Sequence, residues 1–134
     1  MLKTETPVTF NEAKTLVREL VKKKGFPNDK KALTQKLLWA FTELGEGSDA
    51  YKKGEPWDKV VEELVDVFFY ILDFIGLVEQ EYGIEIDVDK VFAEKWYKNM
   101  YERTDQYGQR RDIIQQTWTK PKIENYPEQR CPQF

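Results

Sequence analysis

The segment from about Trp57 to Tyr82 restricts the fold of this chain more than any other part of the sequence. Plotted as an α-helix, at about 100° per residue, it gathers its polar side chains on one narrow face. That face carries Lys59, Glu62, Glu63, Asp66, Tyr70 and Asp73. Nearly all other positions are apolar, which is typical of a buried helix. Its acidic stripe is therefore expected to face inward or line a cleft, where ionised carboxylates need a partner.

Cap signals and apolar spacing predict three further helices. The four expected helices span about 10–24, 30–54, 57–82 and 88–105. Thr9 and Glu12 form a capping-box pattern before the first helix, and Gly83 suits the C-terminal cap of the third. Gly45 and Gly47 are unusual inside a helix, and close approach of a ligand or of another helix would explain them. Strand signals are weak, so the fold class expected is all-α, with a four-helix bundle core.

The sequence changes character after Arg111. Residues 112–134 contain three prolines and scattered aromatic side chains, which favour an irregular, extended tail over another helix. We therefore expect one helical domain over residues 1–111 and a C-terminal tail over 112–134. The aromatic residues of the tail suggest that it packs against something.

Composition excludes several classes of protein. The 134 residues carry a formal charge of −3, whereas general nucleic-acid binders usually have a basic excess. No apolar run is long enough to span a membrane, and the first residues lack the apolar core of a signal peptide. The single cysteine, Cys131, cannot form an internal disulfide. A cytoplasmic protein is expected.

The absence of histidine narrows the chemistry further. Ser-His-Asp and Cys-His nucleophile systems need histidine, as do the Glu-x-x-His ligand sets of di-iron bundles. Histidine-based zinc sites are excluded for the same reason. A site built from carboxylates in this chain would therefore bind a hard cation or no metal.

Two carboxylate pairs supply such a site. Glu43 and Glu46 lie three residues apart on the second expected helix, and Glu63 and Asp66 repeat this spacing on the third. Spacing i, i+3 places both members of a pair on one helix face. Four carboxylates converging from two helices cannot all stay ionised without a cation. Oxygen-only ligands suit Mg²⁺, which commonly binds phosphate groups.

The segments LLWAFTELGEGSDAYKKG, from Leu37, and EELVDVFFYIL, ending at Leu72, resemble the MazG-like, all-α nucleoside triphosphate pyrophosphohydrolases. The signature of this family is E-x-x-E, a spacer and E-x-x-D. Lys95-Trp-Tyr-Lys-Asn99 is similar to the K-x-x-x-N of its last core helix. The resemblance covers about residues 10–105. The chain departs from it after Asn99, where relatives often continue with a basic run, and in the tail.

The resemblance implies a four-helix core, dependence on Mg²⁺ or Mn²⁺, and a homodimer or homotetramer. It also implies hydrolysis of a (deoxy)nucleoside triphosphate to the monophosphate and pyrophosphate. We expect Glu43, Glu46, Glu63 and Asp66 to hold the metal, with Glu43 or Glu46 also taking the proton of the attacking water. No nucleic-acid or membrane partner is expected.

Other polar and aromatic residues are candidates for substrate binding. Lys95, Asn99 and Arg103 recur every four residues on the fourth expected helix, and they suit phosphate and sugar oxygens or form a solvated face. Trp39 could stack on a base or pack in a core, and Tyr70 could hydrogen-bond substrate or pack. A further set of lysines is a weaker choice for phosphate, with ordinary solvated side chains as the alternative: Lys36, Lys52 and Lys53. Asp73 could ligate the metal, hydrogen-bond an amide or pair with a lysine.

Two alternative functions remain open from the sequence. A phosphoribosyl-ATP pyrophosphohydrolase or a dUTP/dUDP hydrolase would keep the fold and change the substrate. A non-catalytic helical interaction module would use the acidic stripe to bind a basic partner. The position of Asp66 separates this module from an enzyme, because an exposed stripe favours the module and an inward-facing one favours the enzyme.

Overall fold

In the computed structural model, residues 6–7 and 9–102 are described, and every regular element among them is helical. The expected all-α class is confirmed. The chain divides into two compact units, Met1–Ile84 and Glu85–Phe134. The first contains α1 (Phe10–Lys24), α2 (Leu33–Lys52) and α3 (Trp57–Tyr82), and the second contains α4 (Val88–Tyr97). The expected tail, 112–134, lies outside the described residues.

Local capping explains where the first helix begins and where the first and third helices end. The Thr9 hydroxyl accepts a hydrogen bond from the Glu12 amide at 3.0 Å, as the capping pattern predicts. Gly25 and Gly83 follow α1 and α3 with φ of 71° and 63°, a left-handed conformation that glycine adopts without strain. The expected limits of both helices are therefore confirmed.

The second and fourth helices differ from expectation at their ends. A turn of 3₁₀-helix, η1 (Lys30–Ala32), precedes α2, so the regular α-helix starts later than the sequence suggested. The α-helix of the second unit ends at Tyr97 and continues as a π-helical segment, η2 (Lys98–Glu102). The rest of the expected fourth helix, 103–105, lies outside the described residues.

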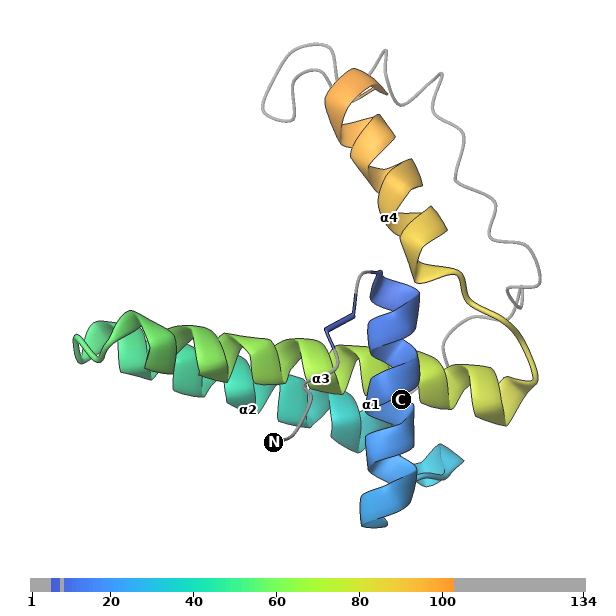
Figure 1. The fold of residues 1–134 in the computed structure, drawn as a ribbon, viewed down its shortest axis with the longest axis horizontal. Coiled ribbons are helices and arrows are strands. Elements are labelled where there is room, and N and C mark those ends of the chain that lie inside the picture. Colours follow the sequence, from blue (N-terminus) through green and yellow to red (C-terminus); the bar gives the residue numbers. More distant parts are fainter. Residues whose placement is uncertain (1–5, 8, 103–134) are drawn as a thin grey trace. The chain divides into compact units, whose positions relative to one another are not determined.

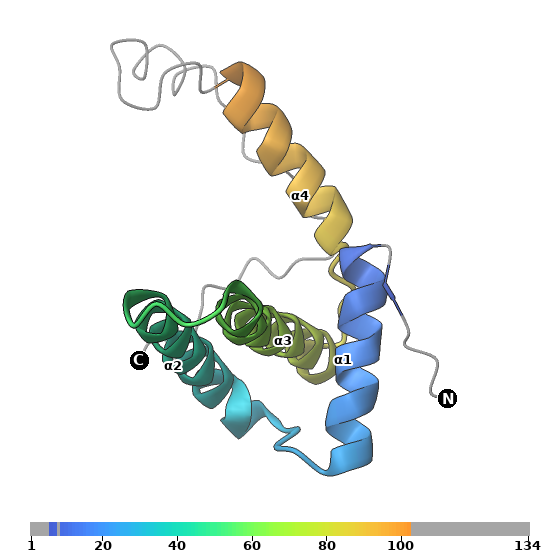
Figure 2. The ribbon, with the colours of Figure 1, turned by 60° about the vertical axis from the view of Figure 1, so that its left-hand side comes forward.

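In the first unit, α2 and α3 run antiparallel side by side, and α1 crosses α3 (Figure 1). Viewed nearly along α2 and α3, α1 lies on the α3 side of the pair (Figure 2). The small apolar core at the crossing consists of Val17, Val21 and Leu72, with Ala13 packed against it. Because α1 contacts only part of α3, bulky apolar side chains elsewhere stay exposed, including Phe41 at 74% and Phe68 at 61%.

Gly47 brings α2 close to α3. A Cβ atom built on Gly47 would lie 2.8 Å from Leu64 Cδ2 and 3.5 Å from Glu63 Cβ, both on α3. Any side chain at this position would therefore push the helices apart or displace Leu64. The expectation that a helix approaches here is confirmed for Gly47, whereas a Cβ at Gly45 would meet nothing within 4 Å.

A buried ion cluster joins all three helices of the first unit. Asp73 of α3 pairs with Arg18 of α1 at 2.5 Å and with Lys36 of α2 at 2.6 Å. Lys36 Nζ also donates to the Pro27 carbonyl oxygen, and Arg18 donates to Asn28 and Gln80. All three charged side chains are at most 10% exposed. Each buried charge has an opposite charge and a further hydrogen bond or ion pair, which offsets the cost of desolvation.

Glycine is also required where Arg18 crosses α3. A Cβ at Gly76 would overlap the aliphatic stem of Arg18, which therefore lies directly on the α3 backbone. This close approach lets a side chain of α1 reach Asp73, one turn before Gly76.

Within residues 6–7 and 9–102, no helix combines the length and apolarity needed to cross a membrane.

The first prediction concerns the Asp73 cluster. Asp73→Asn keeps the shape of the side chain but leaves Arg18 and Lys36 buried without their shared carboxylate. Loss of one partner from a buried ion pair costs about 3–5 kcal/mol. We expect the free energy of unfolding to fall by about this amount in urea denaturation followed by circular dichroism.

Asp49→Asn is the matched control for Asp73→Asn. Asp49 pairs with Lys53 at 2.8 Å, but both side chains are more than half exposed. Solvent already screens this pair, so the control should unfold close to the wild type. If the free energy of unfolding of Asp73→Asn is no lower than that of Asp49→Asn, a stabilising role for the buried cluster is contradicted.

Candidate metal centre

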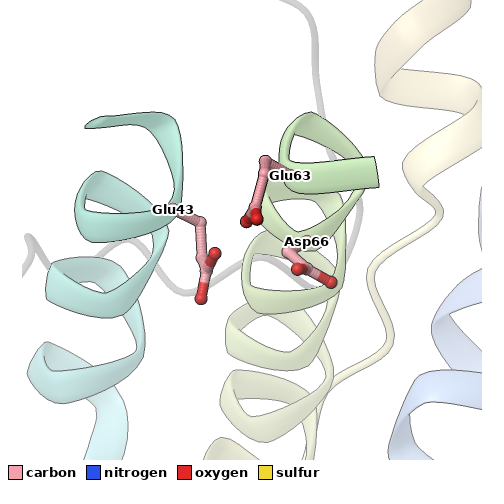
Figure 3. A group of neighbouring side chains, drawn as sticks. All are labelled: Glu43, Glu63 and Asp66. Atoms are coloured by element: carbon pink, nitrogen blue, oxygen red, sulfur yellow. The ribbon is translucent and has the colours of Figure 1, made fainter. Parts of the chain in front are cut away.

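Three of the four predicted carboxylates converge where α2 and α3 pack together. One oxygen each of Glu43, Glu63 and Asp66 can be chosen so that all three lie within 4.8 Å of one another. Figure 3 shows the Glu43 side chain extending from α2 towards α3, on which Glu63 and Asp66 occupy successive turns. All three residues are half-buried. We call them the acidic trio.

The packing of α2 on α3 explains this convergence. Glu43 and Gly47 are four residues apart and share the α2 face that contacts α3. Glu63 is also the residue whose Cβ lies near Gly47, so the close approach of the helices sets the distance between Glu43 and Glu63. Asp66 follows on the same face of α3 because of its i, i+3 spacing from Glu63.

Glu46 is not a member of the acidic trio. It is exposed and shares a side-chain hydrogen bond with Glu43. Its carboxylate therefore lies beside the trio, next to the one member that belongs to the same helix. Its predicted roles as ligand and proton acceptor stay predictions.

Burial, and then crowding of negative charge, raises the pKa values of two members of the acidic trio. Burial raises the pKa of Glu43 from its ordinary 4.5 to about 7, with further contributions from the hydrogen bond and charge of Glu46 and the charges of Asp66 and Glu63. The pKa of Asp66 is raised as well, first by burial and then by Glu63, Glu62 and Glu46. Without a cation the site thus disfavours full ionisation, as expected of carboxylates sharing a small volume.

Lys59 partly neutralises the acidic trio. Its Nζ atom lies 3.1 Å from Glu63 Oε1, an i, i+4 pair on α3. The Lys59 side chain is 48% exposed, whereas that of Glu63 is 17% exposed. One exposed ammonium group therefore balances part of the charge of Glu63 and acts electrostatically on Asp66.

Trp39 and Tyr70 lie next to the acidic trio, along the same contact between α2 and α3. Their ring centroids are 5.6 Å apart and both side chains are half-buried. Burial raises the pKa of Tyr70 first, and the nearby charges of Glu43 and Asp66 raise it further. The two aromatic candidates are thus in contact with each other, close to the carboxylates. Their roles in binding substrate stay predictions.

The remaining substrate-binding candidates belong to the second unit. Lys95 is in α4 and Asn99 is in η2, and both side chains are exposed. The change from α-helix to π-helix between them alters the spacing on which their common face was inferred. Arg103 lies outside the described residues.

The structure corrects the interpretation of Lys36. The sequence suggested a solvated lysine or a weak phosphate ligand, but its side chain is 1% exposed and pairs with Asp73. Of the three roles left open for Asp73, pairing with a lysine is the observed one, and Arg18 is a second partner that the sequence did not indicate. The one available signal was the position of Lys36, four residues before buried Ala40 on the inner face of α2. Lys52 and Lys53 are exposed, and Lys53 pairs with Asp49.

The acidic trio fits a hard divalent cation. All of its donors are carboxylate oxygens, which Mg²⁺ and Mn²⁺ prefer. Ligands that surround one ion at about 2.0–2.1 Å lie at most about 4.2 Å apart. Donor atoms within 4.8 Å of one another therefore need only a small side-chain movement to share an ion. Three protein ligands would leave positions for water or phosphate oxygens.

Comparisons of the chain with protein-family models, curated proteins and solved structures found no match.

The second prediction is a pH dependence of stability that can be assigned to Glu43. Because its folded pKa lies above the ordinary value, the folded state binds the proton more tightly than the unfolded state. The stability that Glu43 contributes is present below pH 4.5 and is lost as pH rises through about 7. The amide side chain of Glu43→Gln does not ionise. Without divalent cations, the free energy of unfolding of this variant minus that of the wild type should therefore increase as pH rises from 4.5 to about 7.

Urea denaturation between pH 4.5 and 8, with a chelator present, measures this difference. Glu19→Gln is the control, because Glu19 is an exposed residue of α1. The difference in free energy of unfolding between Glu19→Gln and the wild type should not change with pH over this range. If the difference for Glu43→Gln does not change with pH either, the crowding of charge at the acidic trio is contradicted.

Proposed function

We propose that the chain is a Mg²⁺-dependent nucleoside triphosphate pyrophosphohydrolase that resembles the MazG-like enzymes. The observation that carries this proposal is the acidic trio, in which two separate helices contribute carboxylate oxygens within 4.8 Å of one another. Half-buried carboxylates with raised pKa values gain most from a bound cation. The E-x-x-E and E-x-x-D spacing, which the resemblance links to this activity, supplies all three residues.

In the proposed reaction, a water oxygen forms a bond to the α-phosphorus as the bond from this phosphorus to the bridging oxygen of the β-phosphate breaks. The products are the nucleoside monophosphate and pyrophosphate. Bound Mg²⁺ would neutralise phosphate charge and lower the pKa of the attacking water. Glu43, Glu63 and Asp66 would hold the ion, and the carboxylate of Glu43 or Glu46 would take the water proton.

The aromatic pair supports a nucleotide substrate. Trp39 and Tyr70 lie beside the trio, so the base of a bound nucleotide can contact these rings while its phosphates face the carboxylates. In this proposal Trp39 stacks on the base and Tyr70 donates a hydrogen bond to the substrate. The sequence-based roles of Lys95, Asn99 and Arg103 in binding phosphate and sugar oxygens stay predictions.

Assembly into a homodimer or homotetramer is part of the proposal. Exposed bulky side chains on α2 and α3, among them Phe41 and Phe68, offer apolar surface that a second copy can cover. The alternative of a non-catalytic module that binds a basic partner is weaker. Such a module needs an exposed acidic stripe, whereas Glu63 and Asp66 are half-buried.

The third prediction tests the activity directly. Asp66→Asn and Glu63→Gln should each reduce kcat/KM by at least about a hundredfold, because an amide oxygen carries no charge to hold the ion. The measurement is Mg²⁺-dependent release of the nucleoside monophosphate from a panel of nucleotides that includes dUTP, dUDP and phosphoribosyl-ATP. Attack at the α-phosphorus releases pyrophosphate from a triphosphate and orthophosphate from dUDP, so orthophosphate released from a triphosphate would point to attack at another phosphorus.

Glu62→Gln is the matched control on the same helix. Glu62 is exposed and is not a member of the acidic trio, so its variant should keep most of the activity. Helical circular dichroism has to be unchanged in all three variants. Full activity in Asp66→Asn or Glu63→Gln would refute the assignment of the site.

A further inference from the structure

Lys59 occupies a distinctive position on α3. Its ammonium group binds Glu63 Oε1 at 3.1 Å, and Glu63 is one of the three carboxylates of the acidic trio. Lys59 also acts electrostatically on Asp66, the second carboxylate that α3 contributes. A positive charge belonging to the chain itself therefore lies at the edge of the candidate metal centre.

The two carboxylate sites along α3 are neutralised in different ways. Asp73 has two cationic partners, Arg18 and Lys36, and both are at least 90% buried. The acidic trio has Lys59, whose side chain is about half exposed. The charge of Asp73 is balanced by buried cationic side chains. The ammonium group of Lys59, which pairs with Glu63, can instead move into solvent at little cost.

We propose that Lys59 is an internal counter-ion of the acidic trio, which competes with the divalent cation for Glu63 and leaves Glu63 when the cation binds. This inference rests on the proposed function, because it requires a cation at the trio. It adds a positioning residue that the E-x-x-E and E-x-x-D pattern does not contain.

The chemistry of the pair supports this exchange. An ammonium group held 3.1 Å from Glu63 Oε1 occupies one of the lone-pair directions that a metal ligand needs. A divalent cation bound to the trio would also repel a lysine charge only one helical turn away. The flexible stem and the exposure of Lys59 allow its ammonium group to swing towards water. Lys59 should therefore lower the affinity of the trio for metal without being needed for the fold.

The fourth prediction follows from this competition. Removal of the charge in Lys59→Gln should make Mg²⁺ bind about two- to fivefold more tightly, the range that an exposed ion pair provides. Lys59→Arg retains the charge and should stay close to the wild-type affinity. The measurement is calorimetric titration of the full chain with Mg²⁺ alone, at low ionic strength and without nucleotide.

Lys53→Gln is the matched control for Lys59→Gln. Lys53 forms the same kind of i, i+4 pair with Asp49, but Asp49 is not a member of the acidic trio. Its variant carries the same change in net charge and should bind Mg²⁺ as the wild type does. A gain that is equal in both variants would show a general charge effect and would overturn the proposal.

The remaining outcomes separate this inference from the proposed function. If the wild type binds Mg²⁺ and Glu63→Gln abolishes binding, while Lys59→Gln has unchanged or lower affinity, only the role of Lys59 is refuted. If the wild type binds no Mg²⁺, or Glu63→Gln has no effect on binding, the metal centre fails and the role of Lys59 fails with it.

Discussion

The close packing of α2 on α3 is the constraint on which the rest of the first unit depends. Gly47 permits the contact at one point of the helix pair, and the ion pair between Lys36 and Asp73 fixes it at another. Between these two points the structure aligns the aromatic pair and the acidic trio. One helix–helix contact therefore determines both the stability of the unit and the distance between carboxylates that lie far apart in the sequence.

Charge along this contact is balanced in two ways. Asp73 has buried cationic partners, so it is a structural group although it belongs to the same polar stripe as Glu63 and Asp66. The acidic trio retains an excess of negative charge, and burial together with this charge raises the pKa values of Glu43 and Asp66. A carboxylate cluster that the fold leaves incompletely neutralised is where an external cation gains most.

Features set by local sequence could be predicted, and those set by tertiary partners could not. Thr9 and Gly83 are found at the helix ends that their capping chemistry predicts. The periodic carboxylate pairs indicated which residues share a helix face, and three of them meet. Burial of Lys36 and the role of Arg18 were missed, because the first depends on how α2 packs on α3 and the second on how α1 crosses α3. No residue spacing within one helix encodes that crossing.

The most direct test of the central claim is to locate a bound ion. Crystals of the full chain grown with Mn²⁺, measured at the manganese absorption edge, would reveal the ion by its anomalous scattering. The account predicts a peak bonded to carboxylate oxygens of Glu43, Glu63 and Asp66. A peak elsewhere, or no peak among these residues at saturating Mn²⁺, would contradict it.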